Sequence, residues 1–173
     1  WESSYELAID LYSDGAESAY LCNDFNKMEC LVKSALTHGR TVLDKIKVYE
    51  TEIQSYIAQN KLLEAVETGL HVLKMLGVNF PMKPGKMNIL SGFIKTELIL
   101  WGKKIEDLFN IPDMTDHKKL AILRIMSTIG SPVYISVPEL LPLLIFTAIN
   151  LSVKYGISPE TPLIYAAYGL ILC

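Results

Sequence analysis

Apolar residues recur at intervals of three and four along much of this 173-residue chain. Three runs stand out because each draws a single stripe along a helix, the pattern of a helix with one buried face. They are Val42, Ile46, Tyr49, Ile53 and Tyr56; Leu62, Val66, Gly69, Leu73 and Leu76; and Leu90, Ile94, Leu98, Trp101, Ile105 and Leu108. The spacing predicts three amphipathic helices, each with its stripe buried.

Capping residues predict where individual helices start and stop. Asp24 can cap a helix that runs toward Leu36 and Gly39. Thr41, with Asp44 three residues later, resembles a capping box, and a helix should follow it. A residue in the left-handed conformation often ends a helix, and residue 77 is a glycine at such a position.

Prolines and glycines predict four interruptions, since proline lacks the amide hydrogen that a helix interior needs. They lie at residues 80–86, at residues 111–113, at Ser131 with Pro132, and at residues 158–160. Thr115 or Asp116 then opens the helix after the second break. Thr161 and Pro162 resemble an N-cap and a first helical residue.

These boundaries predict about eight helices joined by short turns, with no convincing strand. Asn60 leaves only a residue or two between two helices, which makes them antiparallel neighbours. The predicted fold is all-α: stacked antiparallel helix pairs in a tetratricopeptide-like α-solenoid. Residues 1–173 read as one domain, with repeat-like pairs in 1–79, a linker at 80–86, and further helical pairs in 87–173 that are truncated at the C-terminus.

The repeat pattern is partial. Tyr56 and Ala65 stand nine residues apart with Leu62 between them, which matches the aromatic and small residues that pack a tetratricopeptide helix pair. In the preceding pair Tyr20 corresponds to Tyr56, but Glu29 stands nine residues later, and the match fails there. The pairs are 36 or 37 residues apart, and no third copy follows residue 84.

The net charge limits the classes of binding partner, and the cysteine content indicates the cellular compartment. The chain has 16 Lys and Arg against 19 Asp and Glu, a formal charge of −3, and a pI near 5.6. Nucleic acid is excluded as a partner because it requires a basic face. Cys22, Cys30 and Cys173 form no CxxC pair, so we expect reduced, buried thiols in a cytoplasmic protein.

A hydrophobic fraction of 50% and a mean hydropathy of +0.27 raise the question of a membrane span. Residues 133–153 are long enough to cross a bilayer. They contain Pro138, Glu139 and Pro142, however, and a carboxylate within a span is costly. We therefore expect a buried helix there, and the chain opens with no secretory signal.

The sequence lacks an arrangement of residues that catalysis would need. Gly85 with Lys86, and Gly102 with Lys103, lack the glycines and hydroxyl of a phosphate-binding loop. No cofactor is expected. The histidines share no metal-ligand spacing with one another or with a cysteine, and they are His38, His71 and His117.

Paired carboxylates and lysines have ordinary interpretations in this chain. Glu64 with Glu67, and Glu106 with Asp107, stand on lysine-containing helices and read as solvated faces. Lys103 with Lys104, and Lys118 with Lys119, could mark an acidic partner, but such pairs ordinarily serve solubility. Cys22 has no base near it in sequence. We expect no catalytic residue in this segment.

Three phrases carry a resemblance to a known family: LDKIKVYETEIQSYIAQNKLLEAVETGLHVLKMLGV at 43–78, GKKIEDLFNIPDMTDHKKLAILRIM at 102–126, and YAAYGLILC at 165–173. They resemble the helical region of large, often cyanobacterial, multidomain signal transduction kinases. Those proteins join a serine/threonine kinase-like domain and an AAA or STAND-type ATPase to GAF and histidine-kinase modules. The resemblance implies a tetratricopeptide-like segment between ATPase and sensor modules, with all catalytic residues outside it.

The expected function is a non-catalytic interaction module that couples neighbouring domains of its own parent chain. The alternative is a small-molecule sensor, in which aromatic residues line an apolar pocket between helices. The candidate lining residues are Tyr134, Phe146, Tyr155, Tyr165 and Tyr168. Apolar surface on the truncated last helix could also support a homodimer.

Overall fold

The computed structural model describes residues 4–103 and 110–172, and every regular element in them is helical. The α-helices are α1 (Tyr5–Leu21), α2 (Phe25–His38), α3 (Ile46–Ala58), α4 (Leu62–Met75), α5 (Lys86–Leu100), α7 (His117–Ser136), α8 (Leu141–Tyr155) and α9 (Thr161–Leu172). The short 3₁₀ helices are η1 (Leu43–Lys45) and η2 (Pro138–Leu140). The prediction of an all-α fold with about eight helices is confirmed.

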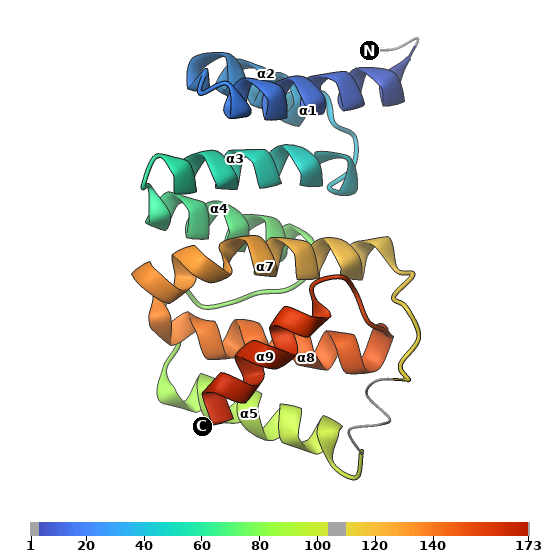
Figure 1. Ribbon diagram of the computed structural model, residues 1–173, viewed down its shortest axis with the longest axis vertical. Coiled ribbons are helices and arrows are strands. Elements are labelled where there is room, and N and C mark those ends of the chain that lie inside the picture. Colours follow the sequence, from blue (N-terminus) through green and yellow to red (C-terminus); the bar gives the residue numbers. More distant parts are fainter. Residues whose placement is uncertain (1–3, 104–109, 173) are drawn as a thin grey trace.

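The helices form successive layers along one long axis, with α1 and α2 at one end and α5 at the other (Figure 1). α1 packs against α2, α3 packs against α4, and α3 also contacts both helices of the first pair. The first pair therefore buries its apolar face against the second pair, as in a helical repeat.

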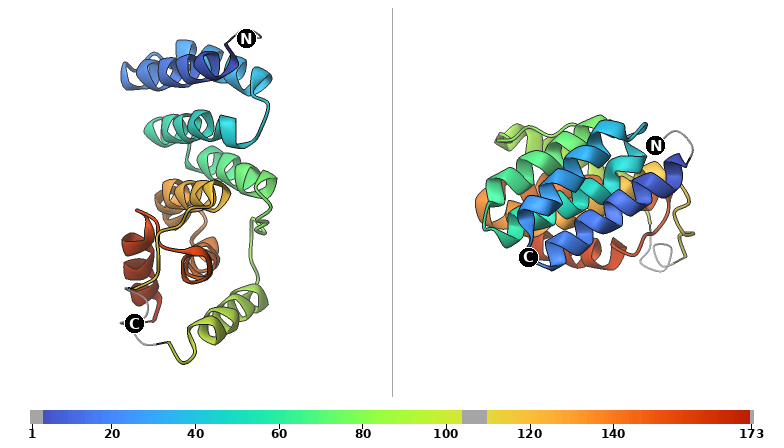
Figure 2. Two further views of the ribbon diagram at one scale, coloured as in Figure 1. Left: turned by 90° about the vertical axis from the view of Figure 1, so that its right-hand side faces the viewer. Right: turned by 90° about the horizontal axis from the view of Figure 1, so that it is seen from above.

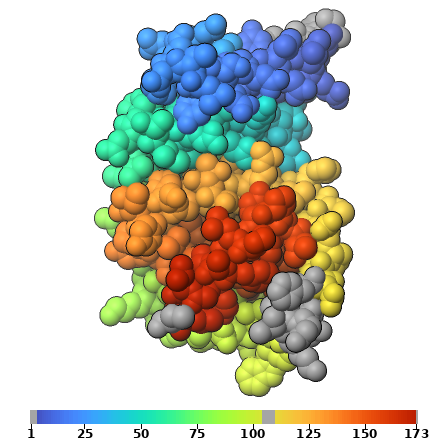
Figure 3. All heavy atoms as spheres, viewed as in Figure 1, coloured from blue at the N-terminus to red at the C-terminus, as the bar shows by residue number. Residues whose placement is uncertain are grey.

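Beyond α4 the order of helices in space departs from their order in the chain. α4 packs against α7, and α7 packs against α8, whereas α5 and α9 each pack against α8. The chain leaves α4, passes along the side of the molecule, and reaches α5 at the far end of the stack (Figure 2). α9 lies across the front of α8 in the space-filling view (Figure 3).

The predicted caps are present at α2, η1 and α4. Asp24 Oδ1 accepts a hydrogen bond from the Lys27 amide at 3.1 Å, and α2 is capped at its other end by residue 39. The Asp44 amide donates to Thr41 Oγ1 at 3.2 Å, and the Thr41 amide donates to Asp44 Oδ2 at 3.0 Å. Gly77 has a φ of +87°, the left-handed conformation that ends α4.

The break predicted at Ser131 and Pro132 is wrong, because α7 continues through Pro132 to Ser136. An interior proline removes one hydrogen bond of the helix. Pro132 is nevertheless buried, so tertiary packing holds the helix in place, and Ser136 Oγ donates to the Pro132 carbonyl oxygen at 2.6 Å. α7 ends before Pro138, where Val137 has left the helical region with a φ of −142°.

The start of the last helix also differs from the prediction. α9 begins at Thr161 itself, so Pro162 is its second residue. Thr161 Oγ1 accepts a hydrogen bond at 2.8 Å from the amide of Ser158, a residue that lies before the helix instead of within it.

The cap predicted at Asp116, before α7, is confirmed, because Asp116 Oδ1 accepts hydrogen bonds from the amides of residues 118 and 119.

The apolar stripe predicted to be buried along residues 90–108 is exposed wherever it is described. The exposed side chains are Leu90 and Ile94 (49% each), Leu98 (65%) and Trp101 (82%). Ile105 and Leu108 lie outside the described residues. The prediction of a buried stripe is wrong because α8 covers a different face of α5, on which Phe93 is half-buried and Thr96 fully buried.

The prediction of buried thiols is also wrong for the two cysteines described. Cys22 and Cys30 are both free and exposed. Cys22 follows the last turn of α1, and on α2 Met28 and Val32 take the inward positions. Cys173 lies outside the described residues.

Two apolar clusters hold the layers together, one across α1 and α2 and a larger one from α3 to α9. Val48 on α3 belongs to the first cluster and Ile53 to the second, so α3 joins them. Residues 133–153 are divided among α7, η2 and α8. Within the described ranges, no helix has the length and apolar character needed to cross a membrane.

Candidate functional site

The five aromatic residues expected to line one apolar pocket are not brought together. Phe146 lies in the core, 5.9 Å between ring centroids from Phe93 and 6.2 Å from Tyr168. The Tyr168 hydroxyl donates to Glu97 Oε1 at 2.6 Å, and burial, followed by this bond, raises the pKa of Tyr168 to about 12. Tyr168 is therefore a structural link between α9 and α5.

The remaining three aromatics lie at separate places. Tyr134 is 68% exposed on α7. Tyr155 is exposed at the end of α8, with the ammonium of Lys119 4.9 Å from its ring centroid. Tyr165 is half-buried on α9, its hydroxyl has no hydrogen-bond partner, and burial raises its pKa.

An open groove of about 670 Å³ lies between α7, α8 and α9, and we call it the α7–α9 groove. Among the described residues, none of those that line it carries a charged side chain. Four large side chains that line it are well exposed, namely Tyr134, Ile135, Leu163 and Leu170. The groove offers apolar contact over three helices, which suits an apolar ligand or the apolar face of another helix.

A second cleft of about 560 Å³ lies between α5, α8 and residues 79–81. Phe146 and Tyr155, two of the five predicted aromatics, line it together with Asn150. Asn150 Oδ1 is buried without a hydrogen-bond partner. Lys95 and Lys154 also line this cleft, so it is more polar than the pocket predicted from the aromatic residues.

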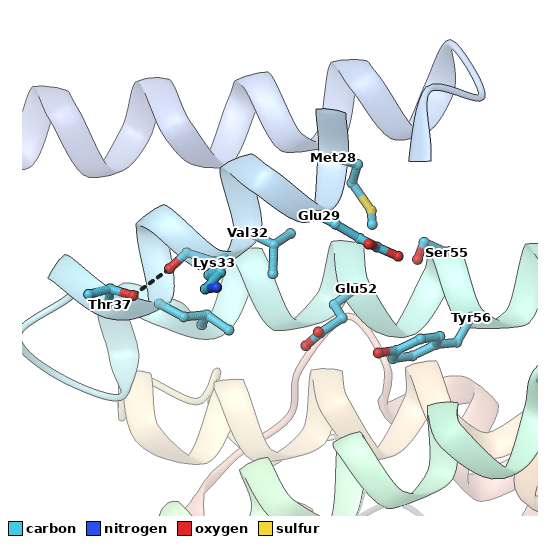
Figure 4. A pocket seen from close by; sticks show the side chains of 9 residues that line it. Met28, Glu29, Val32, Lys33, Thr37, Glu52, Ser55 and Tyr56 are labelled. Carbon is cyan, nitrogen blue, oxygen red and sulfur yellow. Dashed lines mark hydrogen bonds between the residues drawn. The ribbon is translucent and has the colours of Figure 1, made fainter. Parts of the chain in front are cut away.

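A third site is a pocket of about 520 Å³ between α2 and α3, which we call the α2–α3 pocket. Figure 4 shows side chains from both helices directed into one space, with Glu29 reaching down from α2 toward α3. Its lining residues are Met28, Glu29, Val32, Lys33, Leu36, Thr37, Glu52, Ser55 and Tyr56. The pocket thus has an apolar wall and two carboxylates.

The negative charge of Glu29 affects Glu52, and both carboxylates affect the neighbouring phenol. Burial raises the pKa of Glu52, and the negative charge of Glu29 raises it further. Burial also raises the pKa of Tyr56, with added contributions from Glu52, Glu29 and Glu64. The pocket therefore holds one half-buried carboxylate, Glu52, near one exposed carboxylate, Glu29.

Glu29 was visible in the sequence only as the position where the repeat match fails. No sequence pattern marked Glu52 or Ser55 as a site residue, because each is a single polar residue on an amphipathic helix. Their meeting depends on how α2 packs over α3, which the spacing within one helix does not specify. The available hint was that Glu29 occupies the position at which the next helix pair has the small residue Ala65.

The other residues considered for chemistry are dispersed. His38, His71 and His117 are exposed on three different helices, and the described residues contain no group of three or more His, Cys, Asp and Glu that could hold a metal ion. Glu64 and Glu67 are exposed on α4. Glu106, Asp107 and Lys104 lie outside the described residues.

Arg124 on α7 forms an ion pair with Glu50 on α3. Burial raises the pKa of Glu50, whereas the charge of Arg124 lowers it. Glu160 Oε2 nearby is buried without a partner, and its charge adds to the rise. This group links α3 to α7 and offers no nucleophile.

Comparison with known proteins gives no relative: no family, no curated protein and no solved structure matches this chain.

Proposed function

We propose that this chain is a non-catalytic helical-repeat module that couples neighbouring domains of a cytoplasmic, multidomain signalling kinase and ATPase. In this proposal the α7–α9 groove holds an amphipathic helix of a neighbouring domain. The sequence resemblance supports this type of parent protein, and the α7–α9 groove supports a contact with a neighbouring domain.

The observation that carries the proposal is the exposed apolar lining of the α7–α9 groove. Tyr134, Leu163 and Leu170 are 68%, 64% and 80% exposed. Soluble proteins rarely leave a large contiguous apolar patch uncovered, and such patches mark interaction sites. Three helices around an uncharged groove suit the i, i+3, i+4 and i+7 residues of a partner helix.

The test is a pull-down with cross-linking against the separate domains of the parent protein. We expect a saturable contact with the ATPase or kinase part, weakened at least about tenfold by Leu163→Glu or Leu170→Glu. Leu63→Glu is the matched control, because Leu63 is 51% exposed on α4 and does not line the groove. Equal binding by all three variants would place the contact elsewhere.

Self-association through α9 is the competing use of the same surface. Sedimentation of the chain alone distinguishes the two uses. A dimer that Leu170→Glu dissociates, with no contact to any parent domain, would replace the coupling proposal by a homodimer.

A small-molecule sensor remains the second candidate, and the cleft between α5 and α8 favours it. Asn150 Oδ1 is a buried acceptor without a partner, and Phe146 and Tyr155 supply ring surface beside it. A thermal-shift screen of metabolites and lipids tests it, since a ligand that binds the folded chain raises its melting temperature. No shift with any compound would count against the sensor.

A further inference from the structure

The α2–α3 pocket holds features of a binding site that the coupling proposal does not use. We propose that it binds an organic cation, an ammonium or guanidinium group on an aliphatic stem, as in the side chain of lysine or arginine. The pocket lies toward the N-terminal end of the stack, away from the α7–α9 groove, so each site can be tested without the other (Figures 1 and 4).

One wall of the pocket fits the stem. Met28 and Val32 are buried beneath it, and Leu36 is half-buried. Lysine and arginine commonly lay their methylene groups along apolar surface while the charged end remains in a polar environment. The apolar wall therefore favours a cation with an aliphatic stem over a hydrated inorganic ion.

The other wall fits the charged end. Glu29 and Glu52 bring carboxylates from two helices, and Tyr56 points its hydroxyl toward Glu52 in the close view (Figure 4). An ammonium group has three N–H donors and no acceptor, and a guanidinium has five donors. Carboxylate and hydroxyl oxygens are the acceptors that such groups need.

Ser55 is an independent indication that the pocket accommodates a ligand. Its side chain is fully buried, at 0% exposure, and lines the pocket. Its Oγ has no hydrogen-bond partner. A buried hydroxyl without a partner carries an energetic cost, and an N–H donor in the pocket would remove it.

The charges of the lining residues do not balance, which favours a bound cation. Two glutamates and Lys33 line the pocket, so its formal charge is −2 + 1 = −1. Within the described ranges the ion pairs involve Lys47 and Arg124, and none joins Lys33 to Glu29 or Glu52. Burial, and after it the charge of Glu29, raises the pKa of Glu52, and a bound cation would favour the charged form of this carboxylate.

The test is an NMR titration of the 173-residue chain with Nα-acetyl-lysine methylamide. We expect saturable shifts in the amide signals of Glu29, Glu52 and Ser55. The norleucine counterpart has the same stem without the ammonium group and should produce no saturable shift. Equal binding of the two probes, or no shift with the lysine probe, would overturn the proposal.

Variants locate the contact. Glu29→Gln and Glu52→Gln should each weaken binding of the lysine probe about tenfold, equivalent to about 1.4 kcal/mol. Ser55→Ala should weaken it less. Glu67→Gln removes the same charge from an exposed position on α4 outside the pocket and should leave the affinity unchanged. Unchanged affinity in both pocket variants, with melting curves showing folded protein, would contradict the assignment.

Cadaverine distinguishes the source of the cation. Tighter binding of Nα-acetyl-lysine methylamide than of cadaverine assigns the pocket to a lysine on a polypeptide, since only the former carries backbone amides. Tighter binding of cadaverine assigns it to a free amine. Both results keep the proposed chemistry.

Discussion

Helices α3 and α5 each carry an apolar stripe at helical spacing, but they lie in different surroundings. α3 contacts α1, α2, α4 and α7, whereas the extensive contacts of α5 are with α8. Ile53 on α3 is fully buried, and Ile94 on α5 is 49% exposed. The number of neighbouring helices, more than the stripe itself, decides how much of each helix is buried.

This difference follows from the position of each helix in the stack. A helix in an inner layer has neighbours on both sides, and one at the end has neighbours on one side only. α5 approaches α8 closely at Gly92, where an added Cβ would lie 2.9 Å from Leu143 Cδ2. Its apolar stripe faces away from that contact.

The largest expected effect comes from truncating the same residue type in each helix. Ile53→Ala should lower the free energy of unfolding by about 2–5 kcal/mol, because it removes buried methyl groups and leaves a cavity. Ile94→Ala should change it by about 0.5 kcal/mol or less, as expected for an exposed side chain. Urea unfolding followed by circular dichroism measures both.

The matched pair also tests the exposure of α5 in solution. A loss for Ile94→Ala as large as that for Ile53→Ala would mean that another surface covers the α5 stripe. Repeating the measurement at several protein concentrations would then show whether a second copy supplies that surface, because association makes stability depend on concentration.

A second prediction concerns the contact between α4 and α7. A Cβ on Gly69 would lie 2.4 Å from Ile129 Cγ2, and Ile129 is fully buried. Alanine favours a helix more than glycine does. Gly69→Ala should nevertheless destabilise the chain by about 1–3 kcal/mol, because β-branched Ile129 cannot turn away.

A double-mutant cycle checks that the effect arises at this contact. Ile129→Ala removes the clashing atoms, so the double variant should lose less stability than the sum of the two single variants. Gly130→Ala is the control, since an added Cβ there meets no atom within 4 Å, and it should stabilise α7 slightly. Additive losses would show that Gly69 and Ile129 do not meet.

Local signals predicted the fold of the N-terminal region well. The caps at Asp24 and at Thr41 with Asp44 depend on residues within one turn, so their chemistry is legible in the sequence. Pro132 shows the limit, because its effect on α7 depends on the burial that surrounds it. The exposed stripe of α5 shows the same limit, since it depends on which helix lies beside it.

The candidate sites were less predictable than the helices. The aromatic residues chosen from the sequence are distributed between the core and the surface, as with Phe146 and Tyr134. The α2–α3 pocket combines Glu29 with Glu52, which come from different helices 23 positions apart in the sequence. Such a meeting is set by the packing between layers, and periodicity along one helix carries no information about it.

The smallest expected effect concerns α3 itself, where Glu52 interrupts an otherwise well-packed helix. Burial and the charge of Glu29 raise the pKa of Glu52 above its ordinary value of 4.5. The folded chain therefore holds the proton more tightly than the unfolded chain, so the stability that this proton contributes is complete below pH 4.5 and is lost as the pH rises through the raised pKa.

Glu52→Gln removes this loss, so it should raise the melting temperature at pH 7 and leave it nearly unchanged well below the ordinary glutamate pKa. Glu67→Gln, on the exposed face of α4, removes one negative charge from the whole chain without touching the pocket. A stabilisation by Glu52→Gln that exceeds the control only at the higher pH would show that α3 carries a destabilising charge. Equal melting curves for the two variants at every pH would remove Glu52 from that argument.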